Sequence, residues 1–289
     1  MEELEIIVSG RNVKEFSGFL HSRESAEATI KKYTSDIYTF LKYLNGDMKV
    51  NKERVLKYKE WLLEKYAISS VNSMLAAVNQ FLEFLGAGML KVKRIKIQRL
   101  SFRQESREMS EQEYKRLLYA ARAEGKIQLA LCIETIACTG IRISEIKYFT
   151  VERIKAGKIQ VYNKGKYRKI ILPKILRKKL LQYCRENEIQ SGWIFRTRNG
   201  KLKDRSNIWR EMKQLQTRAG IEATKIFPHN LRHLFARVYY KATKDISGLA
   251  DLLGHSSVNV TRIYTAATER FFQKQVDRIV EREIMGVTT

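Results

Sequence analysis

The segment 91–107 interrupts an otherwise helical pattern and thereby divides the chain. It carries seven Lys or Arg residues and one acid, Glu105. Like charges repel one another and keep such a segment extended unless a polyanion lies alongside it. We therefore predict two folded domains, an N-terminal domain at residues 1–90 and a C-terminal domain at residues 108–289, joined by a basic linker.

In the N-terminal part, apolar residues recur at steps of three and four, a spacing that places them on one face of a helix. One stretch follows Ser25-Ala26-Glu27, which we interpret as a helix cap, and runs from Ile30 to Leu44. A second stretch begins at Ser69-Ser70 and ends at Gly86. These patterns predict a small helical bundle with an apolar core.

The C-terminal part combines helical patterns with one short hairpin. Ser110 and Glu113 have the spacing of a capping box, and a long apolar helix then ends at Thr139-Gly140. Residues 158–162 and 168–172 have the composition of two strands on either side of a turn. The predicted fold class is therefore mainly α with a small β-hairpin.

The charge balance of the chain points to a polyanionic partner. Among 289 residues, 55 Lys and Arg outweigh 31 Asp and Glu, for a formal net charge of +24. This excess favours nucleic acid over a membrane surface. The first residues are acidic where a signal peptide would be basic, and no apolar stretch approaches the roughly 20 residues of a membrane span. We expect a cytoplasmic, DNA-binding protein with no membrane contact.

The cysteines argue against a disulfide framework. Cys132, Cys138 and Cys184 are odd in number and lack the spacing of a zinc ribbon. Their apolar or mixed helical surroundings predict buried free thiols.

Five short motifs in the C-terminal half carry the side chains needed to attack a phosphodiester. In chain order they are Thr139-Gly140-Ile141-Arg142-Ile143-Ser144-Glu145, Asn163-Lys164-Gly165-Lys166, His229-Asn230-Leu231-Arg232, Gly254-His255 and Thr261-Arg262-Ile263-Tyr264. The attacked phosphoryl group gains negative charge in the transition state, and that charge must be neutralised. Arg142 and Arg232 suit this task because a guanidinium binds two oxygens and stays charged.

Tyr264 is the candidate nucleophile, although ionising a phenol at pH 7 costs about 4 kcal/mol. His229 is the candidate general base because histidine titrates near neutrality and the i, i+3 spacing places it beside Arg232. His255 is expected to bind a phosphate oxygen or to assist proton movement. Lys164, in the hairpin turn, is expected to protonate the leaving oxygen. The chemistry requires no metal or cofactor, and the chain has no Gly-rich phosphate loop.

This set of residues resembles the catalytic set of the tyrosine recombinases, which include Xer-type resolvases and phage or transposon integrases. The resemblance covers most of residues 108–289, and Leu252-Leu253-Gly254-His255-Ser256-Ser257 is similar to the family's second histidine motif. Asn163 departs from the glycine that the family often has before its lysine. The resemblance implies an N-terminal helical core-binding (SAM-like) domain and a catalytic domain, without the extra arm-binding domain of larger integrases.

The resemblance also implies a reaction and an assembly. Cleavage would give a 3′-phosphotyrosyl link and a free 5′ hydroxyl, and strands would be exchanged through a Holliday junction by a homotetramer on two double-stranded DNA sites. An accessory DNA-bending or directionality protein is a further partner that it allows. An apolar stripe near the C-terminus, which includes Phe271 and Ile284, would dock on a neighbouring subunit.

Several assignments have rivals. Lys166 and Lys169 compete with Lys164 for the role of acid. His229 and His233 have the i, i+4 spacing of a zinc pair, but Asn230 stands where metalloproteases have a catalytic glutamate, so we predict no metal there. Glu145 is expected either to orient a cation of the site or to be a surface acid.

Two other functions would use the same fold: relaxation of DNA in the manner of a type IB topoisomerase, and DNA binding without catalysis. Whether the reaction serves integration, excision or dimer resolution is left open. The linker cations are expected to contact the DNA backbone, and the candidates are Lys91, Lys93, Arg94, Lys96, Arg99 and Arg103.

Overall fold

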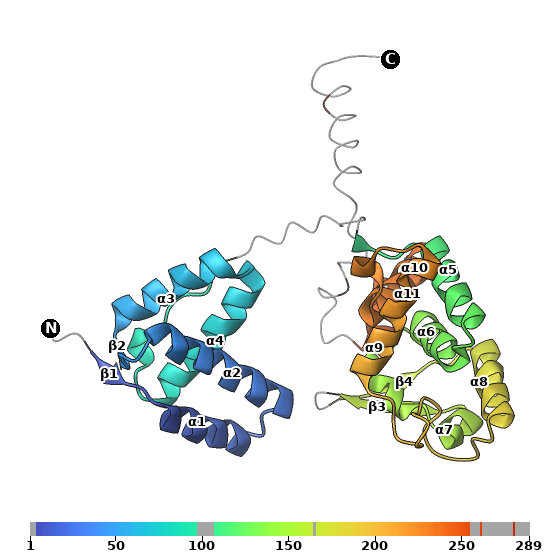
Figure 1. Cartoon of the computed structure of the whole chain (residues 1–289), viewed down its shortest axis with the longest axis horizontal. Helices are drawn as coiled ribbons and strands as arrows, with labels where there is room; N and C mark the ends of the chain where they lie inside the picture. Colours follow the sequence, from blue (N-terminus) through green and yellow to red (C-terminus); the bar gives the residue numbers. More distant parts are fainter. Residues whose placement is uncertain (1–3, 97–106, 164–165, 255–260, 262–279, 281–289) are drawn as a thin grey trace. The chain divides into compact units, whose positions relative to one another are not determined.

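The computed structural model describes residues 4–96, 107–163, 166–254, 261 and 280. The chain divides into two compact units, Met1–Arg99 and Leu100–Thr289 (Figure 1). The described residues are mostly helical, with two small antiparallel strand pairs. The predicted fold class, mainly α with a small β-hairpin, is confirmed.

The N-terminal unit is a bundle of helices closed by a short strand pair. Its elements are β1 (Ile6–Ile7), α1 (Gly10–Ser22), α2 (Glu27–Leu44), β2 (Lys49–Val50), α3 (Lys52–Lys65), α4 (Ile68–Phe84) and the 3₁₀ turn η1 (Gly88–Leu90). Helix α2 packs against both α1 and α4, and α3 packs against α4. Both predicted helical stretches are present, but α2 begins after Ala26 without a side-chain cap, so the predicted Ser25 cap is wrong.

Large aromatic rings fill the core of this unit. Phe16 and Phe81 meet edge to face at 5.3 Å between ring centroids. Phe40 and Tyr58 lie 4.8 Å apart, and both are fully buried. Such rings bury a large apolar area each, and their contacts contribute beyond that area. The apolar spacing read from the sequence therefore marks the core of a stable bundle.

The C-terminal unit surrounds one apolar helix. Its elements are α5 (Glu111–Ala123), α6 (Ile127–Thr139), η3 (Ile143–Tyr148), α7 (Val151–Ala156), β3 (Ile159–Asn163), β4 (Lys166–Ile170), α8 (Lys174–Glu186), α9 (Arg205–Gln214), α10 (Gln216–Ala219), η4 (Ala223–Lys225), α11 (Pro228–Thr243) and α12 (Ile246–Leu253). Helix α6 contacts α5, α8, α9 and α11. This central place explains why its sequence is apolar on nearly all sides.

The boundaries of α5 and α6 follow their capping residues. Ser110 accepts the backbone N–H of Glu113, and Glu113 accepts that of Ser110, so the predicted capping box is confirmed. Helix α6 ends where Gly140 adopts a left-handed conformation with φ of +62°. A Cβ at this position would meet Phe235 at 2.4 Å, so glycine is required by both backbone and space. The end of α6 thus sets the start of the Arg142 motif.

The hairpin pairs β3 with β4 in an antiparallel register. Ile159 lies opposite Ile170, Val161 opposite Arg168, and Asn163 opposite Lys166. The second strand begins two residues earlier than the sequence pattern predicted and ends at Ile170. Residues 164 and 165, which include Lys164, lie outside the described residues.

Two further expectations concern exposure and membranes. Cys132 and Cys184 are buried as predicted, but Cys138 is exposed, because it lies on the side of α6 near its end that the neighbouring helices leave uncovered.

Within the described ranges, no helix combines the length and the apolar character needed to cross a lipid bilayer.

Candidate active site

The structure brings together three of the six predicted catalytic residues. Arg142 precedes η3, and His229 and Arg232 lie on the first turns of α11. Lys164, His255 and Tyr264 lie outside the described residues, as does most of the predicted C-terminal stripe. The described part of the candidate site therefore consists of its two arginines and His229.

Arg142 is held by a carboxylate three residues further along the chain. Glu145 accepts the backbone N–H of Arg142 at 2.7 Å, and its other oxygen lies 3.4 Å from the Arg142 guanidinium. The Arg142 side chain keeps 33% of its surface exposed, whereas that of Glu145 keeps 2%. Glu145 is thus a buried acid that orients Arg142, and the alternative left open by the sequence, a surface acid, is wrong.

Arg232 is the most deeply buried cation of the site. Pro228 occupies the first position of α11, where its missing N–H leaves no hydrogen bond unmade, and Arg232 follows one turn later. The guanidinium of Arg232, 1% exposed, donates to the carbonyl of Gly140 and, at 2.8 Å, to that of Leu253. These bonds join α11 to the end of α6 and to the end of α12.

Three arginines converge on the last carbonyls of α12. Arg168 donates to Leu252 at 2.6 Å, Arg232 donates to Leu253 at 2.8 Å, and Arg142 approaches the Gly254 carbonyl at 3.4 Å. The last carbonyls of a helix lack partners within the helix and carry its partial negative charge, so cations are favoured there. The carbonyls of three consecutive residues, 252–254, thereby hold the three guanidinium groups. His255 is the next residue in the sequence.

The pKa of His229 is lowered from its ordinary value. Partial burial is the largest cause, and the positive charges of Arg232 and then Arg142 act in the same direction. The ring meets His233 edge to face at 4.5 Å between centroids. This lowering favours the neutral form of the His229 ring, which is the form that accepts a proton.

The pair of histidines has no metal-binding neighbours in the described residues. No group of three or more His, Cys, Asp or Glu side chains is arranged there to hold a metal ion. His229 and His233 contact each other through their rings.

Sequence reasoning missed Arg168. It lies on β4 with its side chain 13% exposed, and it pairs with Glu145 at 2.6 Å. A signal was available, because alternate residues of a strand share a face and Arg168 shares one with the buried Ile170. By contrast, Lys169 points to the exposed face. Arg168 was not singled out because β4 also contains Lys166 and Lys169, so one more cation in the strand did not indicate a buried side chain.

Asn230 was also missed as a structural contact of the site. Its buried side-chain amide donates to the carbonyl of Arg107 at 3.0 Å and to that of Lys225 at 2.9 Å. Arg237, two turns further along α11, forms an ion pair with Glu108 at 2.9 Å. The start of the C-terminal unit is therefore fastened to the helix that carries His229 and Arg232.

The described part of the predicted linker, residues 91–96, packs against the N-terminal unit. Asn79 exchanges two hydrogen bonds with the backbone of Val92, at 2.8 and 3.0 Å, and Asn72 does the same with Ile95, at 2.9 and 2.8 Å. The cations of this segment remain exposed, namely Lys91, Lys93, Arg94 and Lys96. Arg99 and Arg103 lie outside the described residues.

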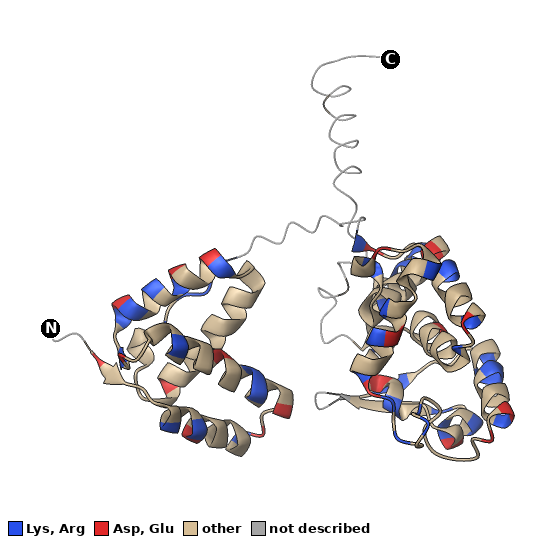
Figure 2. Cartoon of the chain, in the orientation of Figure 1, with Lys and Arg blue, Asp and Glu red and all other residues tan. Residues whose placement is uncertain are grey.

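Cations are not confined to this segment. Figure 2 shows Lys and Arg on the helices of both units. Helix α8 illustrates this, since its thirteen residues include Lys174, Arg177, Lys178, Lys179 and Arg185. The positive charge that the sequence predicts is therefore spread widely over the described surface.

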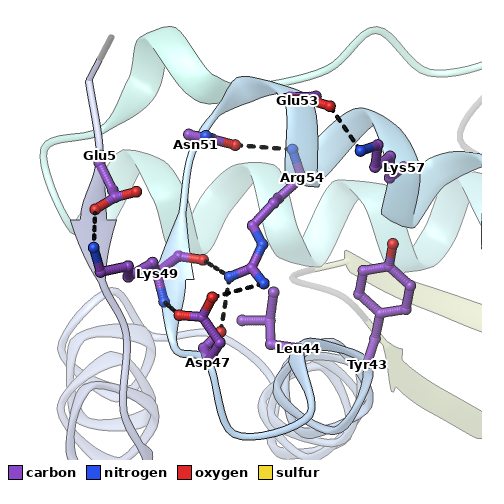
Figure 3. Close-up of a pocket in the computed structure, with 9 residues that line it drawn as sticks. All are labelled: Glu5, Tyr43, Leu44, Asp47, Lys49, Asn51, Glu53, Arg54 and Lys57. Carbon is purple, nitrogen blue, oxygen red and sulfur yellow. Dashed lines mark hydrogen bonds and ion pairs between the residues drawn. The ribbon is translucent and has the colours of Figure 1, made fainter. Parts of the chain in front are cut away.

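A pocket of the N-terminal unit between β2 and α3 is also polar, but its charges are paired with one another (Figure 3). Lys49 pairs with Glu5 at 3.0 Å, and Lys57 pairs with Glu53 at 2.7 Å. Arg54 pairs with Asp47 at 2.9 Å, and it also donates to the carbonyl of Lys49. This balance ties β1 and β2 to α3 and gives the pocket no excess charge for a phosphate.

Known proteins share this organisation. Residues 107–270 match the phage integrase family, and residues 13–87 match the phage integrase N-terminal SAM-like domain. Tyrosine recombinase XerA of Pyrococcus furiosus is 28% identical over 274 residues, which cover 92% of this chain and 93% of the relative. Tyrosine recombinase XerD of Vibrio cholerae is 26% identical over 271 residues, covering 87% of this chain and 90% of the relative.

Solved structures agree in fold. The XerH recombinase bound to its difH substrate superposes with a TM-score of 0.69 at 18% identity, covering 93% of this chain and 84% of that one. A lambda integrase dimer bound to a core site gives a TM-score of 0.72 at 17% identity, covering 90% and 77%. With the catalytic family match spanning residues 107–270, more than half of its length, the chain belongs to the phage integrase family of tyrosine recombinases.

Proposed function

We propose that this protein cleaves and rejoins DNA at specific sites through a covalent link to Tyr264. The observation that carries the proposal is the convergence of Arg142 and Arg232 on the carbonyls of Gly254 and Leu253, directly before His255. This arrangement puts two permanent cations at the start of the segment that leads to Tyr264. Charge of that kind stabilises a phosphoryl transition state without a metal.

In the proposed reaction, the oxygen of Tyr264 forms a bond to phosphorus while the bond from phosphorus to the 5′ oxygen breaks. His229 takes the phenol proton, and Lys164 gives a proton to the leaving 5′ oxygen. Arg142, Arg232 and His255 bind the non-bridging oxygens. The lowered pKa of His229 supports its role, because a neutral imidazole is available at pH 7.

The product is a 3′-phosphotyrosyl link and a free 5′ hydroxyl. A 5′ hydroxyl from a partner strand attacks that link and releases Tyr264, so the number of phosphodiester bonds is conserved. Exchange between two sites requires paired DNA complexes, and we propose a homotetramer acting through a Holliday junction. A lambda integrase tetramer bound to a Holliday junction has this fold, with a TM-score of 0.69. An accessory DNA-bending or directionality protein would act on this assembly, in the cytoplasm.

The nucleophile is tested with a nicked duplex carrying a sequence selected from a random pool for binding to the protein. Cleavage releases the short strand that lies between the cleaved phosphate and the nick. Once this strand dissociates, its 5′ hydroxyl cannot reverse the reaction, so the covalent adduct accumulates. The wild-type protein should form a covalent adduct, and Tyr264→Phe should form none while still binding the duplex. Tyr119→Phe is the matched control, because Tyr119 is 71% exposed on α5. An adduct from Tyr264→Phe would refute the assignment.

The two rival functions are separated by two further assays. A topoisomerase would relax a supercoiled plasmid without exchanging strands between two sites, whereas the proposed recombinase exchanges them. A non-catalytic DNA-binding protein would keep its full function after Arg142→Ala. We expect this variant to lose cleavage and to keep most of its affinity for DNA.

A further inference from the structure

Arg168 is the one described side chain that the hairpin sends into the active site. It lies on β4 opposite the buried Val161, and its guanidinium meets two other segments. One nitrogen pairs with Glu145 at 2.6 Å, and another donates to the carbonyl of Leu252 at 2.6 Å. Glu145 is the same carboxylate that holds Arg142.

The space for this arginine depends on Gly254. A Cβ on Gly254 would lie 2.3 Å from Cδ of Arg168 and 2.8 Å from its Nε. The stem of Arg168 thus runs directly over the backbone that precedes His255. Arg168 therefore joins the hairpin, the Arg142 motif and the end of α12 at a single point.

Two other hydrogen bonds of the described residues tie the hairpin to the C-terminal unit, and the burial of Ile170 holds the end of β4 that is farther from the turn. The Tyr148 hydroxyl donates to the carbonyl of Tyr162 at 3.0 Å, and Arg153 donates to that of Gln160 at 3.4 Å. Both act on β3 and both involve exposed groups. Arg168 acts on β4, through an ion pair that is largely shielded from water and so is weakened little by solvent.

Lys164 follows Asn163, and Asn163 pairs with Lys166, two residues before Arg168. Fixing Arg168 therefore fixes the strand ends on either side of residues 164 and 165 in the chain. We propose that Arg168 is a positioning residue for the proton transfer to the leaving 5′ oxygen: it anchors the hairpin so that Lys164 reaches that atom. This inference rests on the proposed function, with Lys164 as the acid.

A purely structural role for Arg168 makes a different prediction. If the ion pair only stabilised the fold, or only oriented Arg142 through Glu145, its removal would slow cleavage whatever the leaving group. A role through the acid predicts a defect that disappears when the leaving group needs no proton. Substrates with different leaving groups therefore distinguish a structural role of Arg168 from a role in proton transfer.

The test compares two nicked duplexes that differ in one atom at the cleavage site. In the first, the leaving atom is the natural 5′ oxygen; in the second it is sulfur, as a 5′-bridging phosphorothiolate. With sulfur, the Tyr264 oxygen bonds to phosphorus, the phosphorus–sulfur bond breaks, and a thiolate leaves unprotonated. Thiols have a pKa of about 8.5, far below that of an alcohol, so the acid is dispensable.

We expect Arg168→Met to cleave the oxygen substrate about 10- to 100-fold more slowly than wild type, since general acids contribute about 10²- to 10⁴-fold and a misplaced one retains part of this. With the sulfur substrate, its single-turnover rate should return to within about threefold of wild type. The Kd for the duplex should not change. An equal defect on both substrates, or no defect on the oxygen substrate, would overturn the inference.

Two variants make the outcome specific. Lys164→Ala tests the proposed function itself: if sulfur does not rescue it, Lys164 is not the acid. If sulfur rescues Lys164→Ala and fails to rescue Arg168→Met, only the inference about Arg168 is refuted. Arg153→Met is the matched control for a hairpin contact, and it should cleave both substrates at wild-type rates. Should Arg168→Met fail to fold, Arg168→Lys keeps a cation beside Glu145 and undergoes the same comparison.

Discussion

The guanidinium of Arg232 donates a hydrogen bond to the carbonyl of Gly140, two residues before Arg142. The two arginines that we assign to the phosphate are thus connected through the turn that ends α6. Because Arg232 also binds the carbonyl of Leu253, a shift of α11 would move both arginines relative to the end of α12. The candidate site therefore depends on hydrogen bonds to backbone carbonyls as much as on the side chains that we assign to catalysis.

Glu145→Gln should impair both stability and cleavage. Glutamine keeps an oxygen for the Arg142 N–H but removes the negative charge between Arg142 and Arg168. Because removal of one partner of a buried pair costs about 3–5 kcal/mol, and the hydrogen bond is kept here, we expect a loss of about 2 kcal/mol in the free energy of unfolding. Misplacement of Arg142 should slow cleavage about 10- to 100-fold. Denaturant unfolding and single-turnover cleavage measure the two effects.

Glu152→Gln is the matched control for that substitution. Glu152 also accepts a backbone N–H, that of Gly192 at 2.9 Å, but it is exposed on α7. Its replacement should change stability and cleavage little. Equal losses of stability and cleavage rate in the two variants would show that the charge of Glu145 contributes nothing beyond that of an exposed carboxylate.

The lowered pKa of His229 predicts how the protein responds to acid. The unfolded chain binds a proton to this ring below about pH 6.5, whereas the folded protein resists it until a lower pH. The contribution of His229 to stability is therefore complete above pH 6.5 and is lost as the pH falls through the folded pKa. Cleavage should fall over the same lower range, as the base becomes protonated. The NMR titration of the His229 ring gives the pKa directly.

Arg142→Met tests whether the charge of Arg142 contributes to the lowered pKa of His229. Removing a nearby cation should move the pKa of His229 upward, toward 6.5, although burial and Arg232 continue to lower it. A pKa that stays unchanged in Arg142→Met would mean that this arginine does not act on the ring.

Gly254→Ala should be more harmful than Gly220→Ala, although both residues have nearly the same left-handed backbone, with φ of +63° and +60°. A side chain in that conformation costs about 1–2 kcal/mol at either site. At Gly220 an added Cβ meets nothing within 4 Å, whereas at Gly254 it meets Arg168. Overpacking adds about 1–3 kcal/mol, which denaturant unfolding of both variants should reveal. Equal losses would contradict the close approach of Arg168.

Local signals made much of the fold predictable. The Ser110 capping box and the end of α6 at Gly140 were legible because a few neighbouring residues determine them. The start of α2 was not, because Ala26 precedes it without any side-chain bond. The partners that Arg168 and Asn230 bind lie far away in the sequence, at Glu145 and Arg107. Such contacts exist only after tertiary packing, so a sequence motif indicates candidate catalytic residues but not the groups that hold them in place.

Replacing Asn72 and Asn79 by alanine should release residues 91–96 from α4. The double variant lacks four hydrogen bonds to the backbone of Val92 and Ile95, each worth about 1 kcal/mol. Limited trypsin digestion should then cut this segment faster, because its exposed Lys and Arg lie on a backbone no longer held. Asn187→Ala is a control, since the described hydrogen bond of that amide is local, to the carbonyl of Tyr183 in the last turn of α8. Unchanged digestion of the double variant would show that the asparagines do not hold the segment.

The exposed cations of residues 91–96 should contribute to DNA affinity in a salt-dependent way. Lys91 pairs with Glu83, so the sharper test replaces Lys93, Arg94 and Lys96 by glutamine. For every phosphate that is no longer neutralised, the slope of log K against log salt should become shallower by about 0.9, or roughly 3 for three phosphates. Fluorescence anisotropy at several salt concentrations measures this slope. Removing three exposed cations of α8, namely Lys174, Lys178 and Arg185, changes net charge equally and should leave the slope nearly unchanged. If both triple variants reduce the slope alike, the segment acts through general charge and does not bind DNA phosphates directly.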